Sequence, residues 1–581
     1  MSEAALPGDA PVPTPAAAAA RTAWLARWRL AALWATRRRA AAVAAAVAVL
    51  VYIGSLWNGF AYDDAAIIPG DPRVVHFKLL DIFRLPYWRD AADLAIYRPF
   101  TTLSFAVDWF VSHGYAWYFH AVNVLEHGAV TALVCLLLAE LFTPAAALAG
   151  ALIFAVHPVH VEAVANVVGR AEIVSAIFYL GAILVWIRGG SRSTPARVAL
   201  IAVMYAFALL HKESSATLPA ALVLMDAALG RWSFQWERVR DYVRRALPVQ
   251  LVLALILVGF VGLRLAVLGR MAPDVLDPIF DMPMSRAART LTALQAWPVY
   301  LRLLVFPLQL LPDYGPRILM PAFAWTPLAL AGLFILIAVL LAGAVALVRG
   351  HGRSALALLW FPLTVLPVSN LLFPIGIIVA ERTLYLPMLA LCVGVAAALQ
   401  WATSRSALAC RTAVAALLAV VALFSLRTIT RVPAWDSTDR LFLRLNADRP
   451  DSFRGWWHLA RIARRDPKRV DLEMARYHKA MALWPYRRAL VDETAAEGVR
   501  HHRWADARAT AAWAASRWPN DAAAQRYIAV SALALGDSAA ARAATRAGLG
   551  LAPADTLLVR LGRQLDTTAM SVHPSPALSA N

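Results

Sequence analysis

The chain has 581 residues, of which 60% are hydrophobic and 16% are charged, and its formal net charge is +19. Soluble domains are usually about 45–50% apolar and about 25% charged, so this composition excludes an ordinary soluble protein. Many apolar stretches reach the roughly 20 residues with which a helix crosses a bilayer. These features predict an all-α, polytopic membrane protein.

Basic residues lie mainly in short segments between the apolar stretches, at 37–39, 188–197, 231–245 and 349–353. This distribution is typical of the positive-inside rule of membrane topology, and it argues against a nucleic-acid partner. The three cysteines indicate neither a disulfide framework nor a cysteine-ligated metal. All three fall in or beside apolar spans: Cys135, Cys392 and Cys410.

The N-terminal segment, residues 1–39, is predicted to be disordered, basic and cytoplasmic, because it begins rich in alanine and proline and then gains many arginines. The apolar stretch 40–57 follows it. A cleaved signal peptide is the alternative interpretation. The long basic preface and the many later spans favour an uncleaved first helix.

A transmembrane domain of about eleven spans is predicted over residues 40–428, with residues 58–116 as the first outer loop. The segment 291–311 is expected not to cross, since its two prolines and Arg302 suit a re-entrant or interfacial helix. The tail from about residue 430 then lies on the extracytoplasmic side. The remaining spans are expected near 117–141, 145–165, 171–188, 197–211, 214–229, 247–268, 325–348, 355–373, 379–402 and 411–427.

An internal repeat is visible in the tail, where three prolines stand 34 residues apart: Pro485, Pro519 and Pro553. Small residues share this register, at Ala480, Ala514 and Gly548, at Ala507 and Ala541, and at Ala495 and Ala529. Chance spacing in an alanine-rich segment is the alternative. The period is typical of tetratricopeptide repeats, which bind protein segments in a concave groove. Residues 429–567 are predicted to form about three such repeats, and residues 568–581 a disordered tail.

Two adjacent acids, Asp63 and Asp64, follow the first span within the sequence FAYDD. Asp is common in solvated turns, which is the structural interpretation. The functional interpretation is a carboxylate at the membrane surface that takes a proton from an acceptor hydroxyl. Adjacent acids could also raise one another's pKa or share a cation. The dipeptide alone leaves these alternatives open.

The segment HPVHVEAVANVVGRAE, residues 157–172, gathers ionisable side chains at one end of a span. Charges so close to hydrocarbon are costly, and are expected to be paired or to line a polar cavity. A metal site, a structural polar cluster and a site for an anionic headgroup are the three alternatives. The residues concerned are His157, His160, Glu162, Arg170 and Glu172.

Further polar clusters are expected on the same side of the membrane, and their arginines suit phosphate oxygens. Simple pairing of a cation with a nearby acid is the structural alternative. Three polar residues share one helix face, for which a helix–helix contact is the alternative: His120, Asn123 and His127. The other polar residues are Arg98, the triplet His211, Lys212 and Glu213, and the pair Glu381 and Arg382.

Taken together, these motifs resemble those of the transmembrane and tetratricopeptide-repeat O-mannosyltransferases, and they occur in that family's order. The longest two are the most specific. The matching motifs are YDD (62–64), YRPFT (97–101), FHxxNxxxH (119–127), HPVHVEAVANVVGRAE (157–172), HKES (211–214) and SNLLFPIGIIVAERTLYLP (369–387).

The resemblance implies a GT-C glycosyltransferase fold and transfer of a sugar, with inversion, from a polyprenyl-phosphate donor to a Ser/Thr hydroxyl outside the cytoplasm. By that resemblance Asp63 or Asp64 is the general base. The lipid phosphate would be stabilised by Arg98, Arg170, Lys212 and Arg382. The candidate donor site also includes His157, His160, Glu162, His211 and Glu381. Neither a metal nor another cofactor is expected.

Two features depart from the animal members of that family. The repeat array is short, and the composition rich in alanine and arginine suggests a high-GC bacterial genome. An inner-membrane protein with an undecaprenyl-like donor is therefore expected, and its sugar need not be mannose. The alternatives are a non-enzymatic membrane scaffold with a peptide-binding groove and a transferase that modifies a lipid or glycan.

Overall fold

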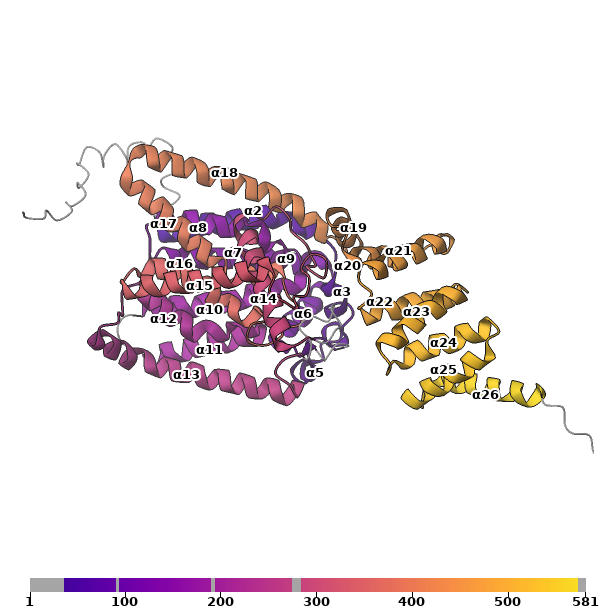
Figure 1. The fold of residues 1–581 in the computed structure, drawn as a ribbon. Helices are drawn as coiled ribbons and strands as arrows, with labels where there is room; N and C mark the ends of the chain where they lie inside the picture. The colour runs from indigo at the N-terminus through magenta and orange to yellow at the C-terminus, as the bar shows by residue number, and fades with distance from the viewer. Residues whose placement is uncertain (1–35, 90–93, 190–193, 274–283, 573–581) are drawn as a thin grey trace, which may run out of the picture.

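The computed structural model describes residues 36–89, 94–189, 194–273 and 284–572. These residues form helices joined by turns and loops, and no strand occurs among them. A bundle of helices, the membrane unit, carries a second helical unit at one end (Figure 1). The all-α prediction is confirmed. Most of the segments predicted to be disordered, 1–39 and 568–581, lies outside the described residues. Of the described part, residues 37–39 begin helix Arg37–Tyr52 and residues 568–572 end helix Thr556–Val572.

Among the described residues, six helical segments are long and apolar enough to cross a membrane, and the bent pair Pro144–Val156 and Pro158–Val164 could be a seventh span. The six include α2 with a following 3-10 turn (Arg37–Trp57), α7 (Ala116–Leu138), a 3-10 turn with α10 (Val167–Arg188), α13 (Trp236–Leu268), α15 (Pro327–Val348) and α18 with a following turn (Ala407–Trp435). Three shorter apolar helices accompany them: α11 (Pro195–His211), Gly352–Val368, which contains α16 (Gly352–Val365), and α17 (Leu389–Arg405). The membrane assignment is thus supported, whereas the expected number of eleven spans is not confirmed.

Threonines and prolines define several helix starts in the bundle. Thr143, Thr194 and Thr326 each accept a backbone hydrogen bond at the N-cap, and each precedes a proline at the first helical position. Proline suits this position because its missing N–H group needs no partner there. Local sequence therefore fixes where α8 (Pro144–Val156), α11 and α15 begin.

Two expected spans differ from the observed helices. The span near 145–165 bends by 48° between α8 and the segment Pro158–Val164, which ends with α9 (Val161–Val164), because Pro158 breaks the helix. The span expected at 379–402 begins only at Leu389, and residues 381–384 form a 3-10 turn instead. The short helix α12 (Leu218–Ala228) follows a third break, the 3-10 turn Glu213–Thr217. These breaks place polar backbone at one end of the bundle.

Helix α14 (Arg286–Val305) is not among the long apolar helices. It packs against α15, and a Cβ atom at Gly332 would overlap the Leu294 carbonyl, so this glycine allows the close approach. Its C-terminal end reaches His157, whose Nε2 lies 3.0 Å from the Leu304 carbonyl oxygen.

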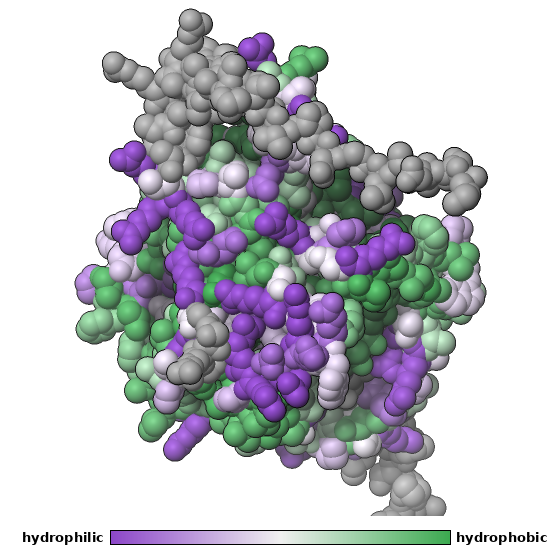
Figure 2. Space-filling model, turned by 90° about the vertical axis from the view of Figure 1, so that its left-hand side faces the viewer, coloured by the Kyte–Doolittle hydropathy of each residue, from purple (hydrophilic) through white to green (hydrophobic). Residues whose placement is uncertain are grey.

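The outer helices expose apolar side chains as a lipid-facing surface would, for example Leu255 on α13, Phe334 on α15 and Leu423 on α18. Helices α13 and α18 lie on opposite outer edges of the bundle (Figure 1). Hydrophilic residues gather on the end face away from the repeats (Figure 2). The described parts of the four basic segments lie at or beside helix ends on that side, namely the start of α2, the end of α10, the start of α11, the start of α13 and the end of α15, so they share one end of the bundle.

Several short helices complete the end of the bundle that faces the repeats. They form the loop after α2 and the turns around residues 158–169 and 213–217. Their bounds are α3 (Asp63–Ile67), α4 (Pro72–Val75), α5 (Leu79–Arg84), α6 (Pro99–Ser112) and the 3-10 turns Val167–Gly169 and Glu213–Thr217.

The second unit is an array of helix pairs. The second helices of the pairs begin at Val470, Trp504 and Ser538, which are 34 residues apart, and each ends two residues before a repeat proline. The predicted small residues are buried where the helices pack. The tetratricopeptide prediction is confirmed. The array comprises α19 (Thr438–Asp448), α20 (Phe453–Ala463), α21 (Val470–Leu483), α22 (Arg488–Arg500), α23 (Trp504–Arg517), α24 (Ala522–Ala534), α25 (Ser538–Leu551) and α26 (Thr556–Val572).

Candidate active site

A partly enclosed cavity lies at the end of the membrane unit that faces the repeats. Segments far apart in the sequence supply its walls, including α3, the start of α6, the turn after α11 and the 381–384 turn. Apolar side chains such as Ile67, Ile96 and Val368 line part of it. Its charged lining residues are Asp63, Arg98, Lys212, Glu213 and Arg382.

Each cation of this cavity is held by an acid. Arg98 and Glu213 form a two-pronged ion pair, with Nε–Oε2 and Nη2–Oε1 distances of 3.0 and 2.8 Å. Burial raises the pKa of Glu213, but the Arg98 charge outweighs it, and the pKa lies well below its usual value. The other two pairs are Lys212 with Glu172 and Arg382 with Glu162. These acids fix the cations in position, and Asp63 adds a fourth carboxylate to the site.

The two adjacent aspartates have different environments. Asp64 is fully buried, and its carboxylate accepts hydrogen bonds from the backbone N–H groups of Val168 (2.8 Å), Val167 (3.2 Å) and Ala61 (3.2 Å). Burial nevertheless raises the pKa of Asp64 to about 7. Asp64 therefore ties the first loop to the N-terminal turn before α10.

Asp63, in contrast, lines the cavity. One of its carboxylate oxygens lies 3.8 Å from Nη2 of Arg382, and its side chain is 17% exposed. Burial raises the pKa of Asp63 above the usual value for aspartate, although Arg382 opposes this shift. A partly exposed carboxylate with a raised pKa beside a fixed arginine is suited to general-base chemistry.

Arg170, for which the resemblance implies contact with the lipid phosphate, is buried outside the described cavity lining. Its side chain is only 1% exposed and does not appear among the described residues that line the cavity. Arg170 pairs with Asp108, donates from Nε to Asn123 Oδ1 (2.8 Å) and donates from Nη2 to the Phe119 carbonyl (3.1 Å). Its donors are used inside the protein, so Arg170 holds helices together.

Four other expected substrate contacts are also buried away from the described cavity lining. His157 contacts the Leu304 carbonyl, and His160 packs between Phe154 and Tyr385. The remaining two are His211, which contacts Thr101, and Glu381, which accepts a 2.8 Å hydrogen bond from Tyr314. Neighbouring helices and turns enclose these four residues in this structure, and their expected contact with the donor stays a prediction.

The shared helix face of His120, Asn123 and His127 is observed, and all three residues are buried. Asn123 donates to the Val167 carbonyl at 3.1 Å, and His127 contacts the Tyr385 hydroxyl at 2.7 Å. These contacts agree with the structural interpretation, in which this helix face makes polar contacts with neighbouring segments.

Three residues at the site were not predicted from the sequence. The Arg98 guanidinium lies 5.5 Å from the Tyr87 ring centroid, and Tyr87 lines the cavity. Arg454, in the first repeat, donates to the Tyr62 hydroxyl at 2.6 Å. Tyr62 stood in a recognised motif, but no spacing rule connects it to a residue 392 positions later.

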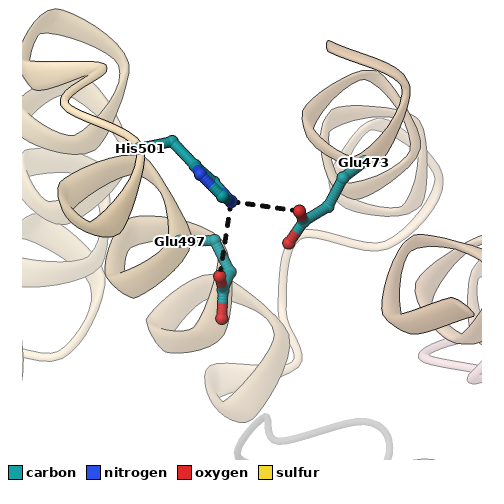
Figure 3. Close-up of side chains that lie close together, drawn as sticks. All are labelled: Glu473, Glu497 and His501. Carbon is teal, nitrogen blue, oxygen red and sulfur yellow. Dashed lines mark hydrogen bonds and ion pairs between the residues drawn. The ribbon is translucent and has the colours of Figure 1, made fainter. Parts of the chain in front are cut away.

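A separate cluster in the repeat unit could be taken for a metal site. Glu473, Glu497 and His501 place their potential ligand atoms within 4.8 Å of one another (Figure 3). However, Arg464 donates to Glu497 Oε1 at 2.9 Å, and Arg500 lies 3.1 Å from Oε2. His501 Nε2 lies 3.0 Å from Glu473. Two cations already neutralise Glu497, so the cluster is interpreted as an ionic network between α21 and α22.

Comparison with known proteins gives a consistent set of relatives. No family model matches the chain. The chain is 28% identical to the human protein O-mannosyl-transferase TMTC4 over 460 residues, covering 69% of the chain and 60% of the relative. It is 29% identical to the human protein O-mannosyl-transferase TMTC3, in a match that covers 68% of the chain and 46% of the relative. It is 34% identical to the Drosophila melanogaster protein O-mannosyl-transferase Tmtc2, in a match that covers 32% of the chain and 21% of the relative.

The chain spans about half the length of several of the curated relatives it matches. Among solved structures, the tetratricopeptide domain of P58(IPK) matches with 10% identity over 68% of this chain and 99% of that one, but its TM-score of 0.22 is too low to support an argument. The curated homologues of this chain are thus protein O-mannosyl-transferases of the TMTC family, which confirms the resemblance seen in its motifs.

Proposed function

We propose that the chain is a membrane glycosyltransferase that moves mannose or another hexose from a polyprenyl-phosphate donor to Ser/Thr hydroxyls of an extracytoplasmic protein. The observation that carries this proposal is the convergence of Asp63 with Arg98, Lys212 and Arg382 around one cavity. The names of the homologues support a protein acceptor. A membrane scaffold would not need this arrangement of charges.

In the proposed reaction, the acceptor hydroxyl oxygen attacks the anomeric carbon of the sugar while Asp63 takes the hydroxyl proton. The bond from that carbon to the phosphate oxygen breaks, and its electron pair leaves with the lipid phosphate. A single displacement inverts the anomeric configuration. Three fixed cations would stabilise the leaving phosphate, so the proposal assigns no step to a metal.

The proposal is tested by incubating the purified chain in nanodiscs with polyprenyl-phosphate mannose, glucose or galactose and a Ser/Thr-rich peptide, with and without EDTA. We expect transfer to the peptide, insensitivity to EDTA and an inverted linkage by NMR. Transfer only to a lipid or glycan acceptor would favour the related-transferase alternative. Absence of transfer from all donors and to all acceptors would contradict the proposal and favour the scaffold.

The pH dependence of transfer is expected to report the base. Burial raises the pKa of Asp63 above 3.8; Arg382 lowers it, Glu162 raises it and Arg454 lowers it. Because the base acts as a carboxylate, kcat/KM should increase with pH and level off above this raised pKa. A pH–rate profile should therefore have an acid limb centred above pH 3.8, which the Arg382→Gln variant shifts to higher pH. A limb that stays in place in this variant would contradict the assignment.

Removing Arg98 is expected to weaken donor binding. The Arg98→Gln variant loses a phosphate donor and leaves the Glu213 carboxylate facing the phosphate. Charge-assisted hydrogen bonds contribute about 1.5–3 kcal/mol, so the donor KM should increase by about 10- to 100-fold. Steady-state kinetics with polyprenyl-phosphate mannose measure this change.

The matched control is Arg231→Gln, which breaks a similar pair with the buried Asp226 of α12; neither residue lines the described cavity. Its donor KM should stay within about twofold of wild type. Equal effects of the two variants would show that loss of stability, and not loss of a phosphate contact, explains the result.

A further inference from the structure

The residue before Asp63 has an unusual backbone conformation. Tyr62 has φ of 55° and ψ of −115°, a region that residues with a Cβ atom rarely occupy. Such conformations persist only where the surroundings enforce them, and they cluster at functional sites. The groups that enforce this conformation therefore bear on the position of Asp63.

The helices at the start of the repeat unit supply these groups. The Tyr62 N–H donates to the Thr438 hydroxyl at 2.8 Å, and Arg454 donates to the Tyr62 hydroxyl at 2.6 Å. The Tyr62 ring also meets Phe442 edge-on, with a centroid separation of 5.6 Å. Backbone, hydroxyl and ring of one residue are thus each held by α19 or α20.

Additional contacts stabilise this junction between the first loop, around Tyr62, and the start of the repeat unit. Gly59 N–H donates to the Asp436 carbonyl at 2.9 Å, and the Asn58 amide donates to the Val432 carbonyl at 3.1 Å. Arg454 also lies 3.7 Å from the buried Asp313 in the segment after α14. The junction therefore links the first loop, the repeat unit and the segment after α14 through a few directional contacts.

We propose that Thr438 and Arg454 are positioning residues that hold Tyr62 in its strained conformation and thereby aim Asp63 into the cavity. Asp64, on the other side of Asp63, is held by three backbone N–H groups. The position of the Asp63 side chain is therefore set by two neighbours, Tyr62 and Asp64, that are each held in place. If Tyr62 relaxed to a common φ, the chain direction entering α3 would change, and Asp63 would move relative to Arg382. This inference rests on the proposed function only for its catalytic consequence.

The structural part is tested on the full-length protein by hydrogen–deuterium exchange. The variants are Arg454→Gln, Tyr62→Phe and Thr438→Val, with Thr438→Ser as the conservative replacement that keeps the hydroxyl. Arg461→Gln is the matched control, since it breaks an ion pair between Arg461 of α20 and Glu493 within the repeats. We expect exchange of residues 60–68 to be about tenfold faster in the first three variants and unchanged in Thr438→Ser and Arg461→Gln. Wild-type exchange in all variants would overturn the proposal.

The catalytic part is tested by transfer kinetics with polyprenyl-phosphate mannose. Small misplacements of a reacting group cost up to about 100-fold in rate, so kcat should decrease about 10- to 100-fold while the donor KM stays within about twofold. Tyr62→Phe and Arg454→Gln remove the same hydrogen bond, so the double variant should be no slower than the slower single variant.

The outcomes separate this inference from the proposed function. If Asp63→Asn is inactive but the junction variants keep a wild-type kcat, the positioning role is wrong and the transferase proposal stands. If Asp63→Asn transfers sugar as wild type does, the proposed base is wrong, while hydrogen exchange still decides whether the repeat unit holds Tyr62.

Discussion

The Asp63→Asn variant is expected to lose at least about 100-fold, and typically about 1000-fold, of its transfer rate. Asn is similar in size and cannot take a proton, so the base is lost while the cavity shape is kept. The Asp63 carboxylate faces the cavity, whereas the backbone anchoring is done by Asp64. The thermal midpoint and the donor Kd should therefore stay close to wild type, as measured by thermal shift and donor titration.

Asp64→Asn is the matched control, because it makes the same change one residue away. The introduced side-chain amide would present its own N–H group to a site built from backbone donors, so a lower thermal midpoint is expected. An Asp63→Asn variant that keeps its rate, with Asp64→Asn folded but inactive, would reverse the two assignments.

The Arg170→Met variant is expected to be the most destabilised single replacement of a charged residue considered for this protein. It leaves Asp108 without its buried partner, and removing one member of a buried pair costs about 3–5 kcal/mol. The loss should appear as a lower thermal midpoint and a lower yield of monodisperse protein in detergent. The fraction that folds should bind donor with near-normal affinity, since Arg170 does not line the described cavity.

The double variant Asp108→Asn, Arg170→Met tests the physical reason. It removes the Asp108 charge that Arg170→Met leaves unpaired, so part of the lost stability should return. If Arg170→Met is instead stable and binds donor poorly, Arg170 contacts the phosphate during the reaction, and its assignment as a structural residue is wrong.

Features that depend on local sequence were predictable. The length of the apolar stretches predicted the membrane helices, and the 34-residue spacing of Pro485, Pro519 and Pro553 predicted the repeat unit. The resemblance brought Asp63, Lys212 and Arg382 to one expected site, and the structure places them around one cavity. Their chemical roles stay predictions.

Features that depend on long-range packing were not predictable. The sequence does not distinguish Asp63 from Asp64, because the backbone donors that bury Asp64 come from residues 167 and 168. Arg170 lies in a recognised motif beside polar residues, but its donors are used by α6 and α7. The expected span 379–402 overlooked Pro387, and the regular α-helix begins only after it, at Leu389.

The junction at Tyr62 has a consequence for acceptor choice. Short, directional contacts join the repeat array to Tyr62, the residue before Asp63. If the proposed acceptor segment docks in the repeats, these contacts set the length of the path from that segment to the proposed base. An extended chain advances about 3.3–3.6 Å per residue, so this length corresponds to a set number of residues. Modified hydroxyls should therefore recur at a constant number of residues from the segment that docks. Sites would then be selected by their distance from that segment more than by the residues that flank them.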